Sequence, residues 1–548
     1  MKATERVFNQ APKAIVHLRT QLEQRRLGLV FGAGISSDLG FPKWSALVDN
    51  IAKNKKVAAK RHLDKCRRES AGASSITRSL ATITQMLYSR FRERRINKLS
   101  QSEPLTFVEE QRHKTEWLRI IHDELYKGID RDAHWAAIKK HPYLRRFEEI
   151  IKKSPMTVTY NFDDSIERIL YEAREGDEVA TSRGYEVADR PNLQFQRHNS
   201  VVYHPNGYIP AIFEDGASSR VVFADDAFQD QLISAATGRY LHLSNHLFRN
   251  TCLLIGLSLD DSTLQSLLRQ NAVNNPGNVH YIIHYMQPGK KLDEEIRKSI
   301  FLTNFESYNL YTIFLDNTEI AAMADLILMD KAGFELEFPR SKTKYVFYVV
   351  GSVGAGKSTV AGHFRNLITY DEWIDARKPE LAVPESEVPG AVDDLNDWIA
   401  EQFRKKNYAL SRCSEGIHLI DRCPLDPLTF GPAVDRVQKA ARLVEKITDD
   451  GERVIEKGHI IFLNCDLEQV KIRNSFKHKY WKPEKYKALL DSLEEIYGPI
   501  VEKSIVCTIG RNAKEVAHEV SKVVFLGEYK PFDVGERLKY FTRDAVSA

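Results

Sequence analysis

The chain has 548 residues, of which 43% are hydrophobic and 28% charged, and its formal net charge is +4. This composition is ordinary for a globular protein and excludes a largely disordered chain. The small net charge gives no basic field that would favour nucleic acid, and no apolar run approaches the roughly 20 residues that cross a bilayer. At about 150 residues per domain, the length predicts three or four domains or two large ones.

The cysteines and the first residues both indicate a reducing compartment. The six cysteines are scattered and none forms a CxxC pair, so neither a disulfide framework nor a four-cysteine zinc site is predicted. The first residues, MKATERVFNQAPK, lack the apolar core of a secretory signal. We therefore expect a cytoplasmic protein that makes no contact with a membrane.

The first half of the chain has the pattern of an α/β domain. A helical stretch at about residues 13–26 leads into a short apolar strand, Leu27–Phe31, and a glycine turn follows at once. Further apolar runs alternate with helical patterns, which predicts a parallel sheet with helices on both faces. These runs are Met156–Thr159, Ser200–Tyr203, Thr251–Ile255, His280–Ile283 and Tyr311–Phe314.

Residues 45–150 interrupt this alternation with a highly charged helical pattern that contains the runs KNKKVAAKRH and RFRERRINK. Such runs either form a solvated helix face or contact nucleic acid. We favour the solvated face, because no interleaved aromatic residues offer stacking surfaces for bases.

A linker is predicted at about residues 331–344, and a second α/β domain begins with the strand Tyr345–Val350. The next residues satisfy the P-loop pattern GxxxxGK[ST] and precede a helical pattern at Val360–Leu367. In a P-loop, backbone N–H groups surround phosphate oxygens, the lysine adds positive charge and a hydroxyl ligates Mg²⁺. We predict that ATP or another nucleoside triphosphate binds here with Mg²⁺ on Ser358; a fortuitous glycine-rich turn is the alternative. The predicted binding residues are Gly351, Gly354, Gly356, Lys357, Ser358 and Thr359.

A second buried strand, Ile417–Ile420, ends in Asp421-Arg422 within the string DRCPLDPLTF. Here the second half resembles the deoxynucleoside and thymidylate kinase branch of P-loop kinases. The resemblance implies that Asp421 ligates Mg²⁺ or accepts the substrate proton, and that Arg422 steadies the phosphoryl group. An N-cap aspartate followed by a surface arginine is the alternative.

Residues 471–479 fall where these kinases place a basic lid over the phosphates, and Arg473 is the candidate phosphate ligand. A solvated basic helix fits the same residues equally well. For the phosphoryl acceptor, residues 370–373 and Arg377 lie in the matching region, but no motif fixes them.

The glycine turn of the first half opens the string GAGISSDLGFPKW. This string is similar to the opening of sirtuin-fold domains, whose loop wraps the pyrophosphate of NAD and needs glycine for a close approach. A short glycine pattern alone also arises by chance. The resemblance implies that NAD contacts Gly32, Ala33, Gly34, Ser36 and Asp38.

A second segment, Thr159–Glu167, is similar to the T-x-N-x-D segment of the same family. The resemblance implies that Asn161 lies beside the nicotinamide ribose and positions the attacking oxygen, while Asp163 supports the loop. A helix cap is the alternative for these residues.

A third segment, Val202–Pro210, resembles the histidine-glycine segment of sirtuins but departs from it. Asn206 stands before Gly207, where the family carries its catalytic histidine, and His204 lies two residues upstream. Either His204 serves as the general base, which we predict, or the usual base is absent.

A fourth segment, Leu254–Asp261, is similar to a string of bacterial sirtuin-like defence proteins, with Gly256 and Ser258 near the adenosine ribose. The paired cysteines of protein-deacetylating sirtuins are missing, since this half contains only Cys66 and Cys252. The resemblance therefore favours hydrolysis of NAD to nicotinamide and ADP-ribose over deacetylation.

Together these patterns predict an α/β protein of two domains. Residues 1–335 would form a Rossmann-like, sirtuin-fold NAD hydrolase with a helical insertion, and residues 340–548 a P-loop kinase-like domain with a parallel sheet. We expect the second domain to gate the first in antiviral defence, with a nucleotide or viral protein as trigger, and we expect a homo-oligomer from the resemblance. An active nucleoside or nucleotide kinase with a regulatory NAD-binding domain is the alternative, and a non-enzymatic assembly is a third.

Overall fold

The computed structural model describes residues 2–69, 80–99, 106–172, 184–189, 199–219, 221–223, 227, 229–230, 233, 241–259, 261–339, 341–382, 392–475 and 482–543. These residues form two compact units. Unit 1 comprises residues 1–10, 21–271 and 280–329, and unit 2 comprises residues 11–20, 272–279 and 330–548. Within the described residues, no helix combines the length and apolarity needed to cross a membrane.

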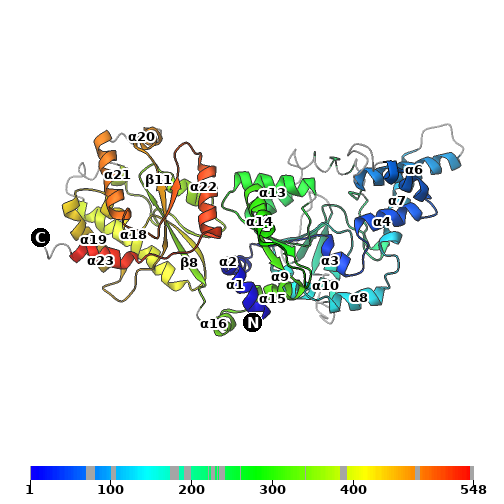
Figure 1. Ribbon diagram of the computed structural model, residues 1–548, viewed down its shortest axis with the longest axis horizontal. Coiled ribbons are helices and arrows are strands. Elements are labelled where there is room, and N and C mark those ends of the chain that lie inside the picture. Colours follow the sequence, from blue (N-terminus) through cyan, green and yellow to red (C-terminus); the bar gives the residue numbers. More distant parts are fainter. Residues whose placement is uncertain are drawn as a thin grey trace. The chain divides into compact units, whose positions relative to one another are not determined.

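Unit 1 is built on a seven-stranded sheet with the strand order β3-β4-β2-β1-β5-β6-β7 (Figure 1). Every pairing in this sheet is parallel. The strands are β1 (Leu27–Phe31), β2 (Thr157–Thr159), β3 (Tyr185–Ala188), β4 (Ser200–Tyr203), β5 (Thr251–Ile255), β6 (His280–Tyr285) and β7 (Leu310–Leu315).

The central strand β1 explains why this sheet is covered on both faces. All five of its residues are buried, and successive side chains point to opposite faces of a strand. Val30 joins an apolar cluster with residues of α12 and α13, whereas Phe31 packs edge-on against Phe147 at 6.3 Å between ring centroids. A continuous apolar run is the expected sequence of a parallel strand buried on both faces.

The helices of unit 1 surround the sheet and extend into the charged region. They are α1 (Ala3–Gln10), α3 (Ala33–Asp38), α4 (Trp44–Lys53), α5 (Lys60–Glu69), α6 (Leu80–Leu99), α7 (Phe107–Leu125), α8 (Arg131–Lys140), α9 (Glu148–Lys153), α10 (Ser165–Glu172), α12 (Leu241–Arg249), α13 (Ser262–Asn274), α14 (Glu294–Tyr308) and α15 (Asn317–Leu328). Short 3₁₀ turns lie at η2 (Leu144–Phe147) and η3 (Phe213–Asp215).

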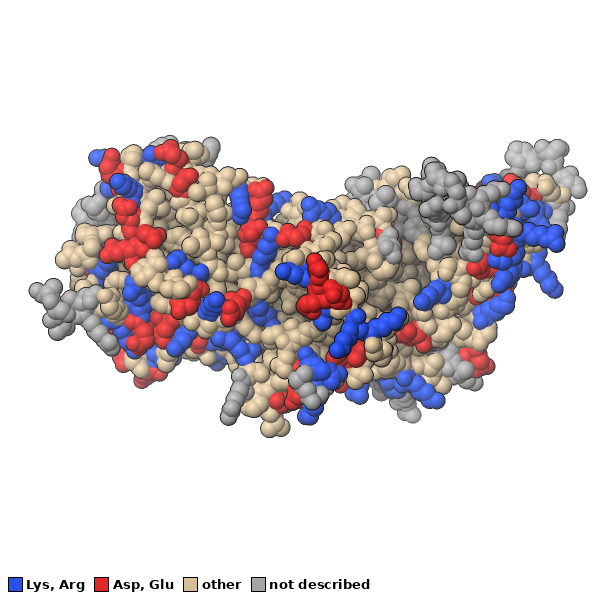
Figure 2. Space-filling model, viewed as in Figure 1, with Lys and Arg blue, Asp and Glu red and all other residues tan. Residues whose placement is uncertain are grey.

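Lys and Arg side chains gather over α4, α6 and α7, as Figure 2 shows for one face. Several of these charges pair with acidic residues of α7. Arg92 of α6 lies 3.1 Å from Glu110, and both Lys56 (at 3.3 Å) and Arg95 pair with Glu116. The basic runs thus form charged helix faces that are paired across neighbouring helices.

Unit 2 is built on a five-stranded parallel sheet with the order β12-β11-β8-β10-β9. The strands are β8 (Lys344–Gly351), β9 (Ile368–Tyr370), β10 (Gly416–Asp421), β11 (His459–Asn464) and β12 (Ser504–Cys507). With two parallel sheets and helices between the strands, the predicted α/β fold class is confirmed.

Helices cover both faces of this second sheet. Residues of α18, α19, α21 and α23 pack on one face in a single apolar cluster with β8 and β10, and α22 lies on the other side of the sheet (Figure 1). The helical elements are α16 (Lys331–Glu337), α17 (Lys357–Gly362), η4 (Pro379–Ala382), α18 (Val392–Arg412), η6 (Asp426–Thr429), η7 (Ala433–Asp435), α19 (Arg436–Ile447), α20 (Leu467–Ser475), α21 (Pro483–Tyr497), α22 (Ala513–Ser521), η8 (Lys522–Leu526) and α23 (Val534–Arg543).

Two sequence expectations are wrong in detail. The predicted linker at about 331–344 contains helix α16. Asp330 caps the N-terminus of this helix, because its side chain accepts a hydrogen bond from the Gly333 N–H at 2.7 Å. The predicted helix at Val360–Leu367 is α17, which begins earlier at Lys357 and ends at Gly362.

Unit 2 also takes in two segments from the first half of the chain. Most of helix α2 (Pro12–Glu23) belongs to it, and so do residues 272–279. The Lys13 ammonium donates to the carbonyl oxygens of Val524 and Gly527 at 2.6 and 2.7 Å. Gly277 packs so closely on α17 that an added Cβ would lie 2.3 Å from the carbonyl oxygen of His363.

Candidate functional sites

The strand order of unit 1 places the glycine turns at a switch point of the sheet. From β1 the chain moves to β2 and the strands beyond it, and then returns to β5 on the other side of β1. In open α/β sheets, ligands bind outside the carboxyl ends of the strands at such a point. The turns after β1 and β5 both lie there, so the topology alone indicates a ligand site at Gly32 and Gly256.

These two turns pack backbone against backbone, which explains their glycines. The N–H groups of Gly32 and Gly34 donate to the carbonyl oxygens of Ile255 and Gly256 at 2.9 and 3.0 Å. A Cβ on Gly32 would lie 2.5 Å from the Gly256 oxygen, and Gly256 itself has a φ of +71°. A side chain at either position would push the two turns apart.

The outer surface of this switch point is lined by small or polar residues. Ala33, Gly34 and Ser258 are exposed, whereas Ser36 is buried beneath them. Asp38 at the end of α3 is exposed, and partial burial raises the pKa of its carboxyl while Lys43 lowers it. Of the candidate NAD residues of the first turn, some thus lie on the surface, where a ligand could contact them, and Ser36 lies beneath that surface.

Asn161 and Asp163 tie the loop after β2 to the turn after β1. Asn161 donates from Nδ2 to the carbonyl oxygen of Gly32 at 3.0 Å. Asp163 accepts a hydrogen bond from the Ser36 hydroxyl at 2.6 Å and another from the Ser165 N–H at 3.1 Å. The side chains that make these hydrogen bonds, those of Asn161, Ser36 and Asp163, are all buried. The two loops therefore form one rigid frame.

His204 lies beneath this frame and is completely buried. Its Nδ1 is 2.9 Å from the carbonyl oxygen of Asn161, and its Nε2 is 2.7 Å from Oε1 of Glu167 on α10. Burial lowers the pKa of His204, but the charge and hydrogen bond of Glu167 outweigh it and leave the pKa raised. For the carboxyl group of Glu167 burial acts in the opposite direction and raises the pKa.

Asn206 is half-buried, and its Nδ2 donates to the carbonyl oxygen of Tyr160 at 3.3 Å. Gly207, the next residue, has a φ of +100°, a left-handed conformation that favours glycine. Asn206 therefore lies in the loop after β4, next to a glycine in a left-handed conformation.

Sequence reasoning missed Asp164, the second aspartate of the same segment. Its carboxylate accepts from the Ala211 N–H at 3.2 Å and from Nε of Arg168 at 3.0 Å, and the Tyr126 hydroxyl lies 3.0 Å away. Tyr126 caps helix α7 of the charged insertion. The doubled aspartate in N-F-D-D was the available signal, but its partners are distant in sequence.

The P-loop of unit 2 lies at the switch point of the second sheet. The chain runs from β8 to β9 and β10 on one side and then crosses to β11 and β12 on the other. The glycines Gly351, Gly354 and Gly356 have φ values of +146°, +87° and +97°. These left-handed conformations curl the loop so that its N–H groups can face a phosphate.

Lys357 is folded back into the P-loop. It is 6% exposed, and its ammonium donates to the carbonyl oxygens of Gly351 and Ser352 at 2.7 and 3.0 Å. Burial, with a smaller contribution from the charge of Arg422, lowers the pKa of Lys357 to about 8. Ser358 and Thr359, the following residues of α17, are exposed and available to a bound nucleotide and its metal.

Asp421 ends β10 and is 1% exposed. Among the described residues, neither of its buried carboxylate oxygens accepts a hydrogen bond. A buried carboxylate without a donor is costly unless a cation or donor joins it in the functional state. A carboxylate is an oxygen ligand of the kind that suits Mg²⁺, which completes its coordination with water and phosphate oxygens. No group of three or more His, Cys, Asp or Glu side chains in the described ranges could hold a metal by itself.

Arg422 is held in a strained conformation beside Asp421. Its φ is +75°, which is uncommon for a residue with a side chain and often found at functional sites. Its guanidinium contacts Oε1 of Glu372 at 2.5 and 2.9 Å and lies 3.6 Å from Oδ2 of Asp426. Burial raises the pKa of Glu372, but Arg422 and Lys357 outweigh burial and lower it.

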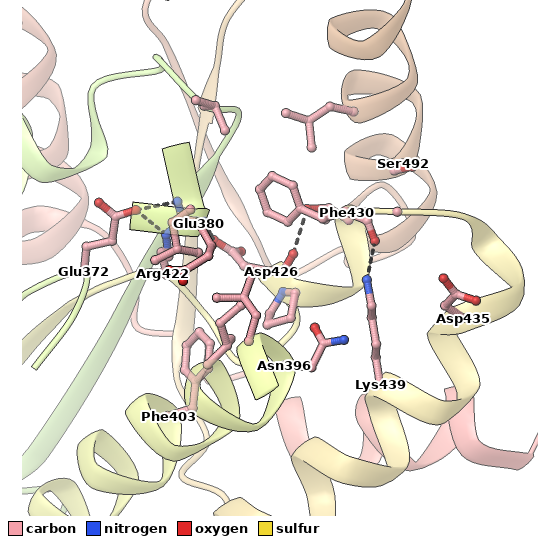
Figure 3. A pocket seen from close by; sticks show the side chains of 18 of the residues that line it. Glu372, Glu380, Asn396, Phe403, Arg422, Asp426, Phe430, Asp435, Lys439 and Ser492 are labelled. Atoms are coloured by element: carbon pink, nitrogen blue, oxygen red, sulfur yellow. Dashed lines mark hydrogen bonds and ion pairs between the residues drawn. The ribbon is translucent and has the colours of Figure 1, made fainter. Parts of the chain in front are cut away.

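A cavity of about 540 Å³ opens beside Arg422 (Figure 3). Glu372 and Arg422 lie at one end, Asp435 and Lys439 at the other, and Asp426 and Phe430 stand between them. The remaining wall is largely apolar and includes Trp373, Leu395, Ile399, Phe403 and Leu489. This volume lies within the range of small-molecule sites. Of the lining residues, the sequence had indicated Glu372, Trp373, Arg377 and Arg422, and most of the others come from η4, α18, η6, η7, α19 and α21.

Arg473 lies on the other side of the P-loop. Its guanidinium donates to the carbonyl oxygens of Ala355 and Thr508 at 3.3 and 3.1 Å. It borders a second hollow of about 310 Å³ beside Gly354, Gly356 and Asn512. The rest of the predicted basic lid, at 476–479, lies outside the described residues.

Comparison with known proteins identifies a sirtuin-type segment in unit 1. Residues 155–313 match the SIR2-like domain family. No curated protein matches the chain in sequence. Among solved structures, the chain is similar to deoxyadenosine kinase from M. mycoides with bound dATP, at 14% identity and a TM-score of 0.27 over 32% of this chain and 96% of that one. It is also similar to the NadR protein in complex with NAD and AMP-PNP, at 12% identity and a TM-score of 0.26 over 69% of this chain and 90% of that one.

The SIR2-like match contains Asn161, Asp163, His204, Gly256 and Ser258. The first glycine turn, residues 32–38, lies before the matched range. The match therefore covers the loops after β2, β4 and β5, and the backbone contacts described above join the first turn to them.

Proposed function

We propose that unit 1 is an NAD glycohydrolase that releases nicotinamide and ADP-ribose. The observation that carries this proposal is the buried frame in which Asn161 bonds Gly32 and Asp163 bonds Ser36, at the switch point of a sheet in which strands β2 to β6 lie within the SIR2-like match. The frame fixes one polar amide beside an open surface of small residues, which suits a dinucleotide and a positioned water.

The proposed reaction needs few groups. The oxygen of water attacks the anomeric carbon of the nicotinamide ribose, and the bond from that carbon to the nicotinamide nitrogen breaks. The electron pair of that bond neutralises the pyridinium charge, and the spare water proton passes to solvent. Asn161 would position the water or the ribose hydroxyls. Gly32, Ala33 and Gly34 would lie against the pyrophosphate, and Gly256 and Ser258 near the adenosine end.

An Asn161→Ala substitution tests this proposal. We expect nicotinamide release from NAD to fall by at least about a hundredfold, because water is no longer oriented at the reacting carbon. An exposed asparagine of the same unit, Asn97→Ala on α6, serves as the matched control. Equal release by wild type and Asn161→Ala would contradict the assignment.

We further propose that unit 2 binds a nucleoside triphosphate with Mg²⁺ and gates unit 1. Support comes from the left-handed glycines of the P-loop, the buried Lys357 and the carboxylate of Asp421, which accepts no hydrogen bond among the described residues. An ungated NAD hydrolase would drain the NAD of its own cell. We therefore place this pair of activities in cytoplasmic antiviral defence, in a homo-oligomer released by a nucleotide or a viral protein.

The cavity of unit 2 favours a second candidate function, phosphoryl transfer to a small acceptor. The cavity reaches Arg422 and Glu372 beside the P-loop, so an acceptor bound there would approach the terminal phosphate. Asp421 would hold Mg²⁺ or take the acceptor proton, and Arg422 would steady the phosphoryl group. Under this alternative, unit 1 only binds NAD or ADP-ribose. Incubation with labelled ATP and a panel of nucleosides and nucleotides decides it, and Asn161→Ala would leave the transfer intact.

A further inference from the structure

The partners of His204 determine what its imidazole can do. The ring lies inside unit 1 with no exposed surface and packs against Tyr208 at 4.8 Å between ring centroids. One nitrogen contacts the main chain of Asn161, and the other contacts the carboxyl group of Glu167. These two contacts use both in-plane positions of the ring.

The chemistry of the partners fixes the protons. A carbonyl oxygen can only accept, so Nδ1 of His204 carries a hydrogen and donates it to Asn161 at 2.9 Å. Nε2 is directed at Oε1 of Glu167, 2.7 Å away, whether the shared proton lies on the ring or on the carboxyl group. Neither nitrogen therefore offers a lone pair to a water molecule in the candidate NAD site.

The contacts continue from His204 to the glycine turn. The carboxyl group of Glu167 is hydrogen-bonded to His204, and His204 is hydrogen-bonded to the carbonyl of Asn161. The Asn161 side chain in turn donates to the carbonyl of Gly32. We infer that His204 and Glu167 form a buried positioning pair that fixes Asn161 against Gly32, and that NAD cleavage in this chain uses no imidazole base. This inference rests on the proposed hydrolase function and assigns His204 a different role from the general base expected from the sequence.

The proposed reaction is compatible with the absence of such a base. Nicotinamide leaves as a neutral molecule from a cationic pyridinium, so its departure needs no proton donor. Water attacks the anomeric carbon as that bond breaks, and the spare water proton goes to solvent. At the position before Gly207, Asn206 can orient a water through its amide but cannot accept the proton.

The charged groups around the pair belong to the same support. Asp163 and Glu167 face His204, Asp164 faces Glu167, and the Tyr208 ring lies against the imidazole. Asp163 is already bonded to Ser36 and Asp164 to Arg168. The pair is thus enclosed by groups that have partners of their own, and moving His204 towards substrate would leave Glu167 buried without its partner.

Two substitutions of His204 separate positioning from base catalysis. His204→Asn keeps an amide N–H near the position of Nδ1, whereas His204→Leu keeps the volume and removes both polar contacts. We expect His204→Asn to retain kcat within about tenfold of wild type with an unchanged pH profile, and His204→Leu to lose at least about a hundredfold. A general base would lose about 10²–10⁴-fold in both variants. A wild-type limb in kcat/KM near pH 6–7 that disappears in His204→Asn would overturn the inference.

A second readout does not depend on turnover. Hydrogen exchange of the backbone at residues 159–165 should be faster in His204→Leu and Glu167→Leu than in wild type, and unchanged in His204→Asn. Exchange that is equally slow in all four proteins would overturn the positioning pair. If wild type released no nicotinamide under any condition, the hydrolase proposal would fail, while the exchange measurement would still decide the role of His204.

Discussion

Lys357 and Asp421 of unit 2 have incomplete electrostatic surroundings. The lysine is folded onto two carbonyl oxygens of its own loop, and the carboxylate of Asp421 accepts no hydrogen bond among the described residues. Arg422, in its strained conformation, brings a second cation close to Lys357 and contributes to lowering its pKa. Under the proposed function, a Mg²⁺-bound triphosphate would supply a cation for Asp421 and anions for Lys357 and Arg422.

The pKa of Lys357 predicts how nucleotide affinity depends on pH. Burial, and then Arg422, lower this pKa to about 8 in the free protein, and phosphate oxygens beside the ammonium would raise it again. Below pH 8 the lysine is already protonated and affinity is constant. Above pH 8 binding must take up a proton, so affinity should fall by up to about tenfold per pH unit. Calorimetric titration of ATP with Mg²⁺ at pH 7, 8 and 9 measures this, and an affinity that does not change over this range would contradict it.

At the scale of elements, most of helix α2 belongs to unit 2, although the strand that follows it, β1, belongs to unit 1. Three of its residues make the connection. Lys13 caps the carbonyls at the end of the π-helical turn η8, His17 contacts Phe525 at 5.5 Å between ring centroids, and Arg19 pairs with Glu415 and lies 4.3 Å from the ring centroid of Phe334. Residues 524–527 and two earlier residues of unit 2 are thus packed by a helix near the start of the chain.

Lys13→Ala should destabilise unit 2 even though it lies far away in sequence. The substitution removes the donor for the partly buried carbonyls of Val524 and Gly527, which costs about 1–3 kcal/mol in the free energy of unfolding. The melting temperature should fall by about 2–4 °C per kcal/mol. Lys487→Ala, at an exposed lysine of α21, is the matched control. Identical melting of the two variants would show that α2 does not support unit 2.

The sequence predicted those elements whose residues have one dominant environment. Strands β1 and β5 are apolar throughout because both of their faces are buried, and their predicted bounds are those of the structure. Strands β3 and β9 were missed because they are short edge strands with half-buried residues, YEVA and ITY. The sequence predicts a linker in place of helix α16 because the glycine and the charges of this segment outweigh the capping signal of Asp330.

The same distinction applies to the sites. Asn161 and Gly32 could be expected to meet, because each follows a parallel strand and the carboxyl ends of such strands lie at one edge of the sheet. The burial of His204 could not be predicted, since its partner Glu167 lies in the first turn of a separate element, α10, and the sequence does not show that the two side chains meet. The cavity of unit 2 combines residues from six separate helical elements, and no local sequence pattern predicts that combination.

At the scale of the whole molecule, two parallel sheets each carry a candidate ligand site at a switch point, and segments of the first half of the chain belong to unit 2. Under the proposed gate, nucleotide binding and NAD hydrolysis are linked by a coupling free energy, typically of about 1–3 kcal/mol. Such coupling requires that the nucleotide favour one state of the protein over another.

The gate makes a prediction for Lys357→Ala. In wild type, the rate of nicotinamide release should change when Mg²⁺ and the correct nucleoside triphosphate are added, by about 5–150-fold for a coupling of this size. Lys357→Ala should give the same rate with and without nucleotide, because the phosphates lose their buried cation. Lys487→Ala, exposed on α21, should respond as wild type does. A full nucleotide response in Lys357→Ala would show that the P-loop does not control nicotinamide release.

The most direct test of the account is nicotinamide release from NAD by the purified full-length protein, with Mg²⁺ and a panel of ribo- and deoxynucleoside triphosphates, in wild type and Asn161→Ala. The account predicts stoichiometric nicotinamide and ADP-ribose from wild type and a loss of at least about a hundredfold in Asn161→Ala. No release by wild type under any nucleotide, together with phosphoryl transfer to a nucleoside, would contradict the hydrolase and establish the kinase alternative.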